Sequence, residues 1–66
     1  MNDLGEAIKF YKKLKAISTK ELAKQLGVTE TTIHYWEHGI RTPKLDNIQK
    51  MAKVFKIKVE QLTQYL

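Results

Sequence analysis

With 66 residues, the chain is long enough for one small domain and lies near the lower limit at which a hydrophobic core is stable without disulfides or metals. It has no cysteine and no apolar run of membrane-spanning length, which excludes disulfides and thiolate metal sites and leads us to expect a cytoplasmic protein. Twelve Lys and Arg residues against seven Asp and Glu residues give a net charge of +5, which favours an anionic partner such as nucleic acid.

The first helix is expected from Asp3 or Leu4 to Lys15. Its predicted buried face consists of apolar residues at helical spacing, namely Leu4, Ile8 and Tyr11. Phe10 and Leu14 form a second apolar pair one turn apart, and two interpretations are open. The pair either widens the buried face, which we prefer because core-facing helices usually need a wide apolar stripe, or forms a patch for a partner or for dimerisation.

A second helix is expected to begin at Thr19. Ser18 followed three residues later by Glu21 is a capping box, in which the serine side chain accepts a hydrogen bond from the start of the helix. The apolar residues of this helix form one narrow face, which consists of Leu22, Ala23 and Leu26. Gly27 ends the helix, because glycine adopts the left-handed backbone conformation without a steric penalty.

After a short turn, a third helix is expected from Thr29 to His38. Thr29 is a favourable N-cap, and Ile33 and Trp36, spaced by three residues, predict the buried side. The side chains predicted to face outward are Glu30, Thr31, Thr32, His34, Tyr35 and His38. Because this face is polar and almost uncharged within a basic chain, the helix fits the major groove of DNA.

The rest of the chain predicts two more helices. Gly39 ends the third helix, and a fourth is expected from Lys44 or Leu45 to Phe55. Its predicted buried face contains Leu45, Ile48, Met51, Ala52 and Phe55. Lys56 follows this helix at a position where a left-handed conformation would cost about 1 kcal/mol in a residue other than glycine. A last helix is expected over residues 59–65, so residues 1–66 predict a single all-α domain of five helices.

Several of these residues together resemble the helix-turn-helix of the phage repressor/Cro-like family, also called XRE-like. The signature residues are Leu22-Ala23, Gly27-Val28-Thr29, Ile33, Trp36-Glu37, Gly39 and Pro43. The resemblance extends over residues 4–62 and implies a compact five-helix repressor-like DNA-binding domain, with the helix-turn-helix at about residues 19–38. It also implies an internal ion pair between Lys12 and Glu37, because family members usually pair an arginine with this glutamate.

The resemblance also assigns roles to individual side chains. Those that fall on or near base edges in related repressors are Glu30, Thr31, His34 and Tyr35. Those that fall near the DNA backbone are Thr19, Lys20, Thr29, Thr32, His38, Arg41 and Lys44. Arg41 and Lys44 are the main candidates for phosphate contacts, because the loop and the start of the fourth helix follow the DNA backbone in this family. For Glu30, a favourable interaction with the positive end of the helix dipole is an equally good explanation.

Other kinds of chemistry are less well supported. His34 and His38 have the spacing of a shared metal site, but no third ligand of matching spacing accompanies them, so we expect no metal. No nucleophile–base pair, glycine-rich phosphate loop or carboxylate cluster predicts an enzyme, and we expect no cofactor. The basic residues are spread over several elements, which disfavours a helix that lies on a membrane surface.

We therefore expect a transcriptional regulator, in particular a repressor that binds a palindromic operator in double-stranded DNA as a homodimer. Dimerisation is expected because one copy contacts few phosphates. The candidate dimer surface consists of Ile40, Tyr65 and Leu66, although Leu66 is also explained as a cap on the core. The alternative is a protein-interaction module, antitoxin-like or sensor-like, on the same fold, and the polar third helix beside Arg41 and Lys44 favours DNA.

Overall fold

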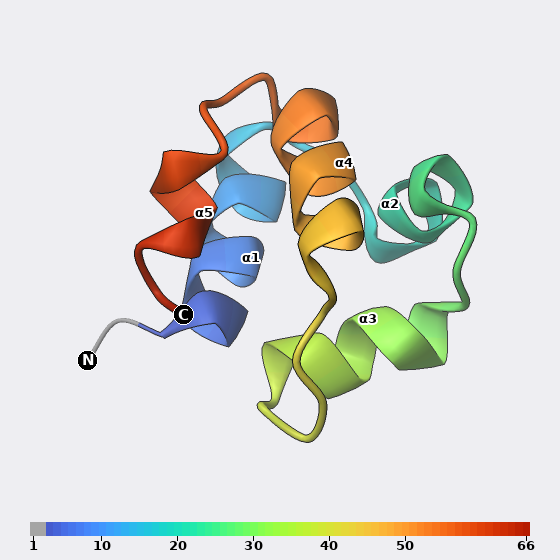
Figure 1. Ribbon diagram of the computed structural model, residues 1–66. Helices are drawn as coiled ribbons and strands as arrows, with labels where there is room; N and C mark the ends of the chain where they lie inside the picture. Colours follow the sequence, from blue (N-terminus) through green and yellow to red (C-terminus); the bar gives the residue numbers. More distant parts are fainter. Residues whose placement is uncertain (1–2) are drawn as a thin grey trace.

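The computed structural model describes residues 3–66, and over this range the chain forms five helices and no strand (Figure 1). The helices are α1 (Leu4–Leu14), α2 (Thr19–Leu26), α3 (Glu30–Glu37), α4 (Leu45–Phe55) and α5 (Glu60–Thr63). The all-α fold class is confirmed, and the first four helices agree with the expected ranges to within one residue at each end. The fifth is shorter than expected, because residues 64 and 65 form a turn and do not continue the helix.

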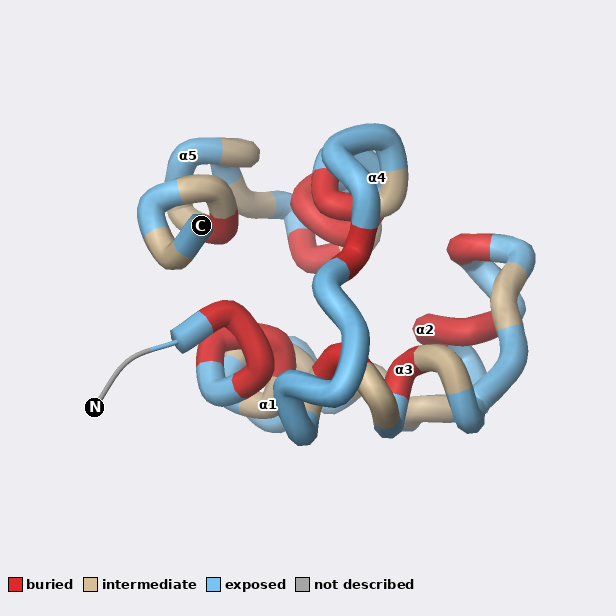
Figure 2. Tube along the Cα trace, turned by 60° about the horizontal axis from the view of Figure 1, so that its bottom comes forward, coloured by how far each residue is buried: buried red, intermediate tan, exposed pale blue. Residues whose placement is uncertain are grey.

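The core lies between the five helices, and each of them contributes buried side chains (Figure 2). α1 packs against α3 and α5, α2 packs against α3 and α4, and α4 packs against α5. The largest fully buried side chains are Ile8, Leu22, Ile33, Ile48, Met51, Phe55 and Leu62. Because α3 packs on both α1 and α2, its inner side is buried, whereas its outer side has no neighbouring helix within the described chain.

The turn between α2 and α3 follows the local rules that predicted it. Ser18 Oγ accepts a hydrogen bond from the backbone N–H of Glu21 at 3.0 Å, which caps α2. The carboxylate of Glu21 accepts from a side chain one turn further along the helix at 2.8 Å, so the expected capping box is only half formed. Gly27 ends α2 with a φ of 72°. Thr29 then caps α3, because its Oγ1 accepts from the N–H of Thr32 at 3.1 Å.

Two expectations about buried faces are wrong. Phe10 and Leu14 do not widen the buried face of α1, because they are 59% and 60% exposed. α3 and α5 cover α1 on one side only and leave this pair uncovered. Leu45 does not belong to the buried face of α4 and is 56% exposed. It stands in the first turn of the helix, next to the connecting loop, whereas Ile48 one turn later is fully buried.

A glycine near the start of α1 sets the distance between α1 and α3. Gly5 is buried, and a Cβ at this position would overlap the backbone of Trp36 and Glu37 at the end of α3. The two helix backbones therefore approach each other closely, which requires a residue without a side chain. The hydrophobic spacing of the sequence gives no sign of this contact.

Within residues 3–66, two residues other than glycine have a positive φ, Ala16 at 55° and Lys56 at 59°. The left-handed conformation considered for Lys56 is thus confirmed. Because a Cβ is unfavourable in this conformation, we expect Ala16→Gly and Lys56→Gly each to raise the free energy of unfolding by about 1 kcal/mol in urea denaturation. Gly27→Ala, at a φ of 72°, is the reverse substitution and should lower the free energy of unfolding. Unchanged stability of both glycine variants would contradict this account.

Candidate nucleic-acid interface

The predicted recognition side chains lie on the open side of α3. The buried residues of this helix are Ile33 and Trp36. Its exposed residues, together with the C-cap, include four candidate DNA contacts: Glu30, Thr31, His34 and His38. The rings of His34 and His38 lie one turn apart with 4.2 Å between their centroids. Thr32 and Tyr35 are half-buried, because they face the loop that leads to α4.

An open groove of about 710 Å³ runs between α3 and the loop that leads into α4. The candidate DNA-contacting residues that line it are Thr29, Thr31, Thr32, Tyr35, Arg41 and Lys44. The other candidates lie outside it, at the start of α2 or elsewhere along α3, and are Thr19, Lys20, Glu30, His34 and His38. The fold thus brings about half of the predicted site together in one groove and leaves the rest on the adjoining surface.

Arg41 is held beside the groove by Tyr35. The guanidinium carbon of Arg41 lies 5.8 Å from the centroid of the Tyr35 ring, which is within the range of a cation–π interaction. The backbone N–H of Ile40 donates to the carbonyl oxygen of Tyr35 at 2.9 Å, so the loop is also hydrogen-bonded to α3. The sequence suggested Arg41 and Tyr35 as separate contacts, and their mutual contact depends on how the loop turns back.

The two threonines at the start of α3 form a hydroxyl pair. Thr29 Oγ1 and Thr32 Oγ1 are 3.0 Å apart, and Thr29 Oγ1 also accepts from the N–H of Thr32. Two hydroxyl groups have two protons, and their shared hydrogen bond uses one of them. The second proton is available to donate to a phosphate oxygen next to the groove. The capping role of Thr29 is therefore compatible with the predicted backbone contact.

Asp46 and Asn47 in the first turn of α4 also line the groove, and neither was predicted from the sequence. The Asp46 side chain accepts a hydrogen bond from the N–H of Asn47 at 2.9 Å. Its carboxylate reduces the positive charge that Arg41 and Lys44 bring to the groove but does not cancel it. The signal that could have found them is their position two and three residues after Lys44, at a helix start already expected to follow the DNA backbone.

A family model described as helix-turn-helix matches residues 8–62, which include all of α2, α3 and α4. The chain belongs to the phage repressor/Cro-like (XRE-type) helix-turn-helix family. It is 38% identical over 58 residues to an uncharacterised HTH-type transcriptional regulator of Methanocaldococcus jannaschii, and the match covers 88% of each chain. Family membership supports a DNA-binding regulator of transcription. None of the helices in residues 3–66 is long and apolar enough to cross a membrane.

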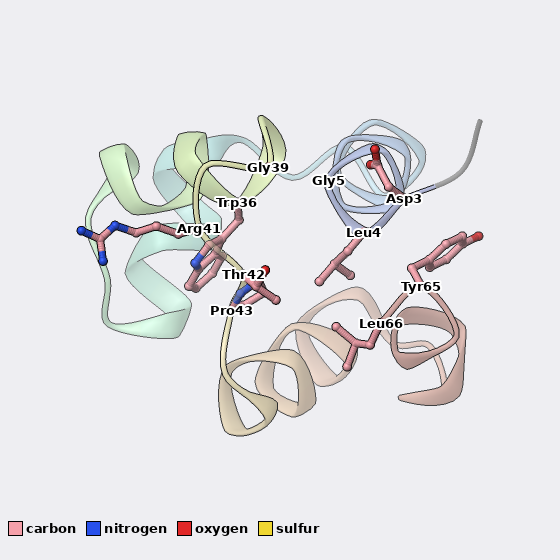
Figure 3. A pocket seen from close by; sticks show the side chains of 10 residues that line it. All are labelled: Asp3, Leu4, Gly5, Trp36, Gly39, Arg41, Thr42, Pro43, Tyr65 and Leu66. Atoms are coloured by element: carbon pink, nitrogen blue, oxygen red, sulfur yellow. The ribbon is translucent and has the colours of Figure 1, made fainter.

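Of the candidate dimer residues of this helix-turn-helix protein, Ile40 lies in the loop between α3 and α4, and Tyr65 and Leu66 follow α5. Ile40 and Leu66 are 61% and 65% exposed, so the alternative that Leu66 caps the core is wrong. Tyr65 and Leu66 border a hollow of about 350 Å³, which α1, the end of α3 and the α3–α4 loop also line (Figure 3). The side chain of Arg41 extends away from this hollow, and the residue also lines the groove beside the recognition helix.

Behind the recognition helix, Lys12 connects three elements. Its Nζ lies 2.5 Å from Glu37 Oε2 at the end of α3, and it donates to Thr19 Oγ1 at the start of α2 at the same distance. The side chains of Lys12 and Glu37 are only 16% and 10% exposed. The predicted ion pair is confirmed, whereas the contact with Thr19 was not expected. Because Thr19 Oγ1 accepts from Lys12, its own proton points elsewhere and is available to a DNA phosphate.

We expect Lys12→Met to lower the free energy of unfolding by about 3 kcal/mol, because it leaves a largely buried carboxylate without its counter-charge. Lys12→Arg retains the positive charge and should lose much less stability. Urea denaturation followed by circular dichroism measures both variants. Equal stability of Lys12→Met and the unsubstituted protein would show that the ion pair does not hold the helices together.

Proposed function

We propose that the protein is a repressor that occupies a palindromic operator as a homodimer, with α3 of each copy in a major groove. The observation that carries this proposal is the groove between α3 and the loop to α4, because it combines neutral polar side chains with positioned cations. Thr31 and Tyr35 supply polar groups that can meet base edges. Arg41 and Lys44 supply the positive charge that attracts phosphates.

The size of α3 suits a position in the major groove. The diameter of a helix with its side chains, about 10–12 Å, matches the width of the groove, and the eight residues extend about 12 Å along their axis. In this position the Thr31 hydroxyl or methyl and the Tyr35 hydroxyl contact base edges. Glu30 and His34 follow on the exposed side of the same helix and reach adjoining bases, where Glu30 can accept from a cytosine amino group.

Residues on both sides of α3 contact the DNA backbone in the proposed complex. Arg41, Lys44 and the free hydroxyl proton of the Thr29–Thr32 pair approach phosphates from the loop side. Thr19 and Lys20 at the start of α2 form the other phosphate contacts, together with His38 at the end of α3. These contacts fix the orientation of the domain on the duplex, and the recognition helix then selects the sequence.

The dimensions of the domain support a dimer on adjacent half-sites. Half-sites read by two-fold related helices lie about 34 Å apart. The domain measures 25 × 24 × 21 Å, so two copies that touch at one end fit this spacing. Ile40, Tyr65 and Leu66 are the proposed contact, since Ile40 and Leu66 are exposed apolar residues.

The experiment that tests this function is selection of bound duplexes from a random pool at moderate salt. Recovery of a two-fold symmetric motif would support sequence-specific binding by a dimer and would give the half-site spacing. Recovery of unrelated duplexes whose binding disappears as salt rises would mean that only charge drives binding. A protein-interaction role would then replace the proposed function.

Lys44→Ala should reduce the slope of log Kobs against log salt by about one, because each phosphate contact releases about one counterion. Lys53→Ala removes the same charge from α4 outside the groove and should leave the slope nearly unchanged. Fluorescence anisotropy titrations of an operator duplex at several salt concentrations give both slopes. Parallel lines for Lys44→Ala and the unsubstituted protein would remove Lys44 from the phosphate contacts.

Tyr35→Phe removes a hydroxyl group and keeps the ring that Arg41 contacts. We expect this variant to lose its preference at one base position by about fivefold or more, with an unchanged salt slope. Tyr35→Ala also removes the ring, so it should weaken the phosphate contact of Arg41 and lower the slope as well. Competition titrations with single-base operator variants measure the preference. A uniform loss of affinity for all sequences in Tyr35→Phe would rule out base readout by the hydroxyl.

A further inference from the structure

One side of α1 carries an apolar pair that the DNA interface does not use. Phe10 and Leu14 are 59% and 60% exposed and lie one turn apart. The ring of Phe10 meets the ring of Tyr11 edge to face, with 5.1 Å between the centroids. Tyr11 in turn lies 5.9 Å from the buried ring of Phe55. Phe10 is therefore supported from the core through Tyr11, and both side chains project from a regular helix.

A hollow of about 340 Å³ lies beside this pair. It is lined by Glu6, Ala7, Phe10, Tyr11 and Tyr65. These residues come from α1 and from the end of the chain, which lies next to α1 in Figure 1. Leu14 projects from the same helix about 6 Å beyond Phe10. Each copy of the protein thus has both an exposed leucine and a hollow with aromatic rings in its wall.

The charges on this side of α1 change sign along the helix. Glu6 lies about 6 Å before Phe10 along the axis and is paired with Lys9 of its own helix at 3.3 Å. Lys13 lies about 4.5 Å after Phe10. When two α1 helices pack antiparallel with Phe10 at the centre, Glu6 of each copy faces Lys13 of the other with an axial offset of only about 1.5 Å. Parallel packing would place like charges against each other, which is unfavourable.

The same antiparallel arrangement also fills the hollow. Leu14 of one copy comes to the level of Glu6 on the other, because both lie about 6 Å from Phe10. Ala7 and Tyr65, which also line the hollow, adjoin that level. Lys12 points to Glu37 and Thr19, so α3 lies on a different side of α1 and is not covered by a second copy.

We propose that this face of α1, consisting of Glu6, Phe10, Lys13 and Leu14, pairs antiparallel with the same face of a second copy. The occupant is a second copy because one two-fold axis matches both the charges and the leucine with the hollow. Of the three proposed operator-dimer residues, only Tyr65 also lines this hollow, whereas Ile40 and Leu66 do not, and the α1 contact does not require recognition of an operator. Two helix turns bury less area than a stable interface, so the contact is weak in solution and strengthens when DNA holds two copies side by side.

Charge reversal tests the α1 face directly. Glu6→Lys places lysines opposite Lys13, and Lys13→Glu places glutamates opposite Glu6. At low salt, each variant should weaken self-association by about threefold to tenfold in sedimentation equilibrium at millimolar concentration. An equimolar mixture of the two variants should associate at least as well as the unsubstituted protein, because every contact in the mixed pair then joins opposite charges.

Two controls separate this contact from other effects. Lys53→Glu on α4 makes the same change in net charge as Lys13→Glu on α1, and it should not weaken self-association. The series is repeated in a chain without Leu66, which removes part of the proposed operator-dimer surface. If the charge reversals still change self-association in that chain, the effect comes from the α1 face and not from the operator-dimer surface. Circular dichroism confirms that each variant is folded before its association is compared.

Three outcomes would overturn the proposal. In the first, Lys13→Glu and Lys53→Glu change association by the same amount, so that only net charge matters. In the second, the mixture of Glu6→Lys and Lys13→Glu associates no better than either variant alone. In the third, the unsubstituted protein stays monomeric at millimolar concentration, and a different protein is then the better candidate for binding to Phe10 and Leu14.

Discussion

The contact between the Lys12 ammonium and the Glu37 carboxylate determines where the recognition helix lies. Lys12 belongs to α1, Glu37 is the last residue of α3, and Thr19, which also contacts Lys12, is the first residue of α2. Two turns earlier on α1, Gly5 allows the backbone of Glu37 to approach closely. Glu37 is therefore held at both its backbone and its side chain. The orientation of the outer side of α3 depends on these contacts together with the close packing of Ile33 and Trp36 beneath it.

The apolar core and the polar contacts contribute in different ways. The core is shared by all five helices and supplies most of the favourable free energy of folding, as in other small domains. Burial by itself is not directional, so it does not select one arrangement of short helices. Side-chain caps at Ser18 and Thr29 and the Lys12–Glu37 ion pair provide that selection at the ends of α2 and α3. These residues adjoin predicted DNA contacts: Ser18 precedes Thr19, and Glu37 precedes His38. Thr29 is itself a predicted contact.

The helices were predictable because their signals are local. Ser18, Gly27 and Thr29 mark the helix ends in the sequence, and the structure uses them as caps. The exposure of Phe10, Leu14 and Leu45 was not predictable, since it depends on which side of a helix its neighbours cover.

The candidate site divides in the same way. Its residue types and positions followed from the family resemblance, and the Lys12–Glu37 pair that supports the site followed from it as well. The groove, the contact of Arg41 with Tyr35 and the close approach at Gly5 required the tertiary structure, because they join residues through the path of a loop or the packing of two backbones.

The outer side of α3 itself is almost uncharged. Within the described helix, Glu30 has the one formal charge among the outward residues, and the cations flank the helix. In the proposed complex, attachment to any duplex and selection of a sequence therefore depend on different side chains. Such a protein keeps its contacts between cations and phosphates while it slides along DNA, and it stops where the bases match its recognition helix.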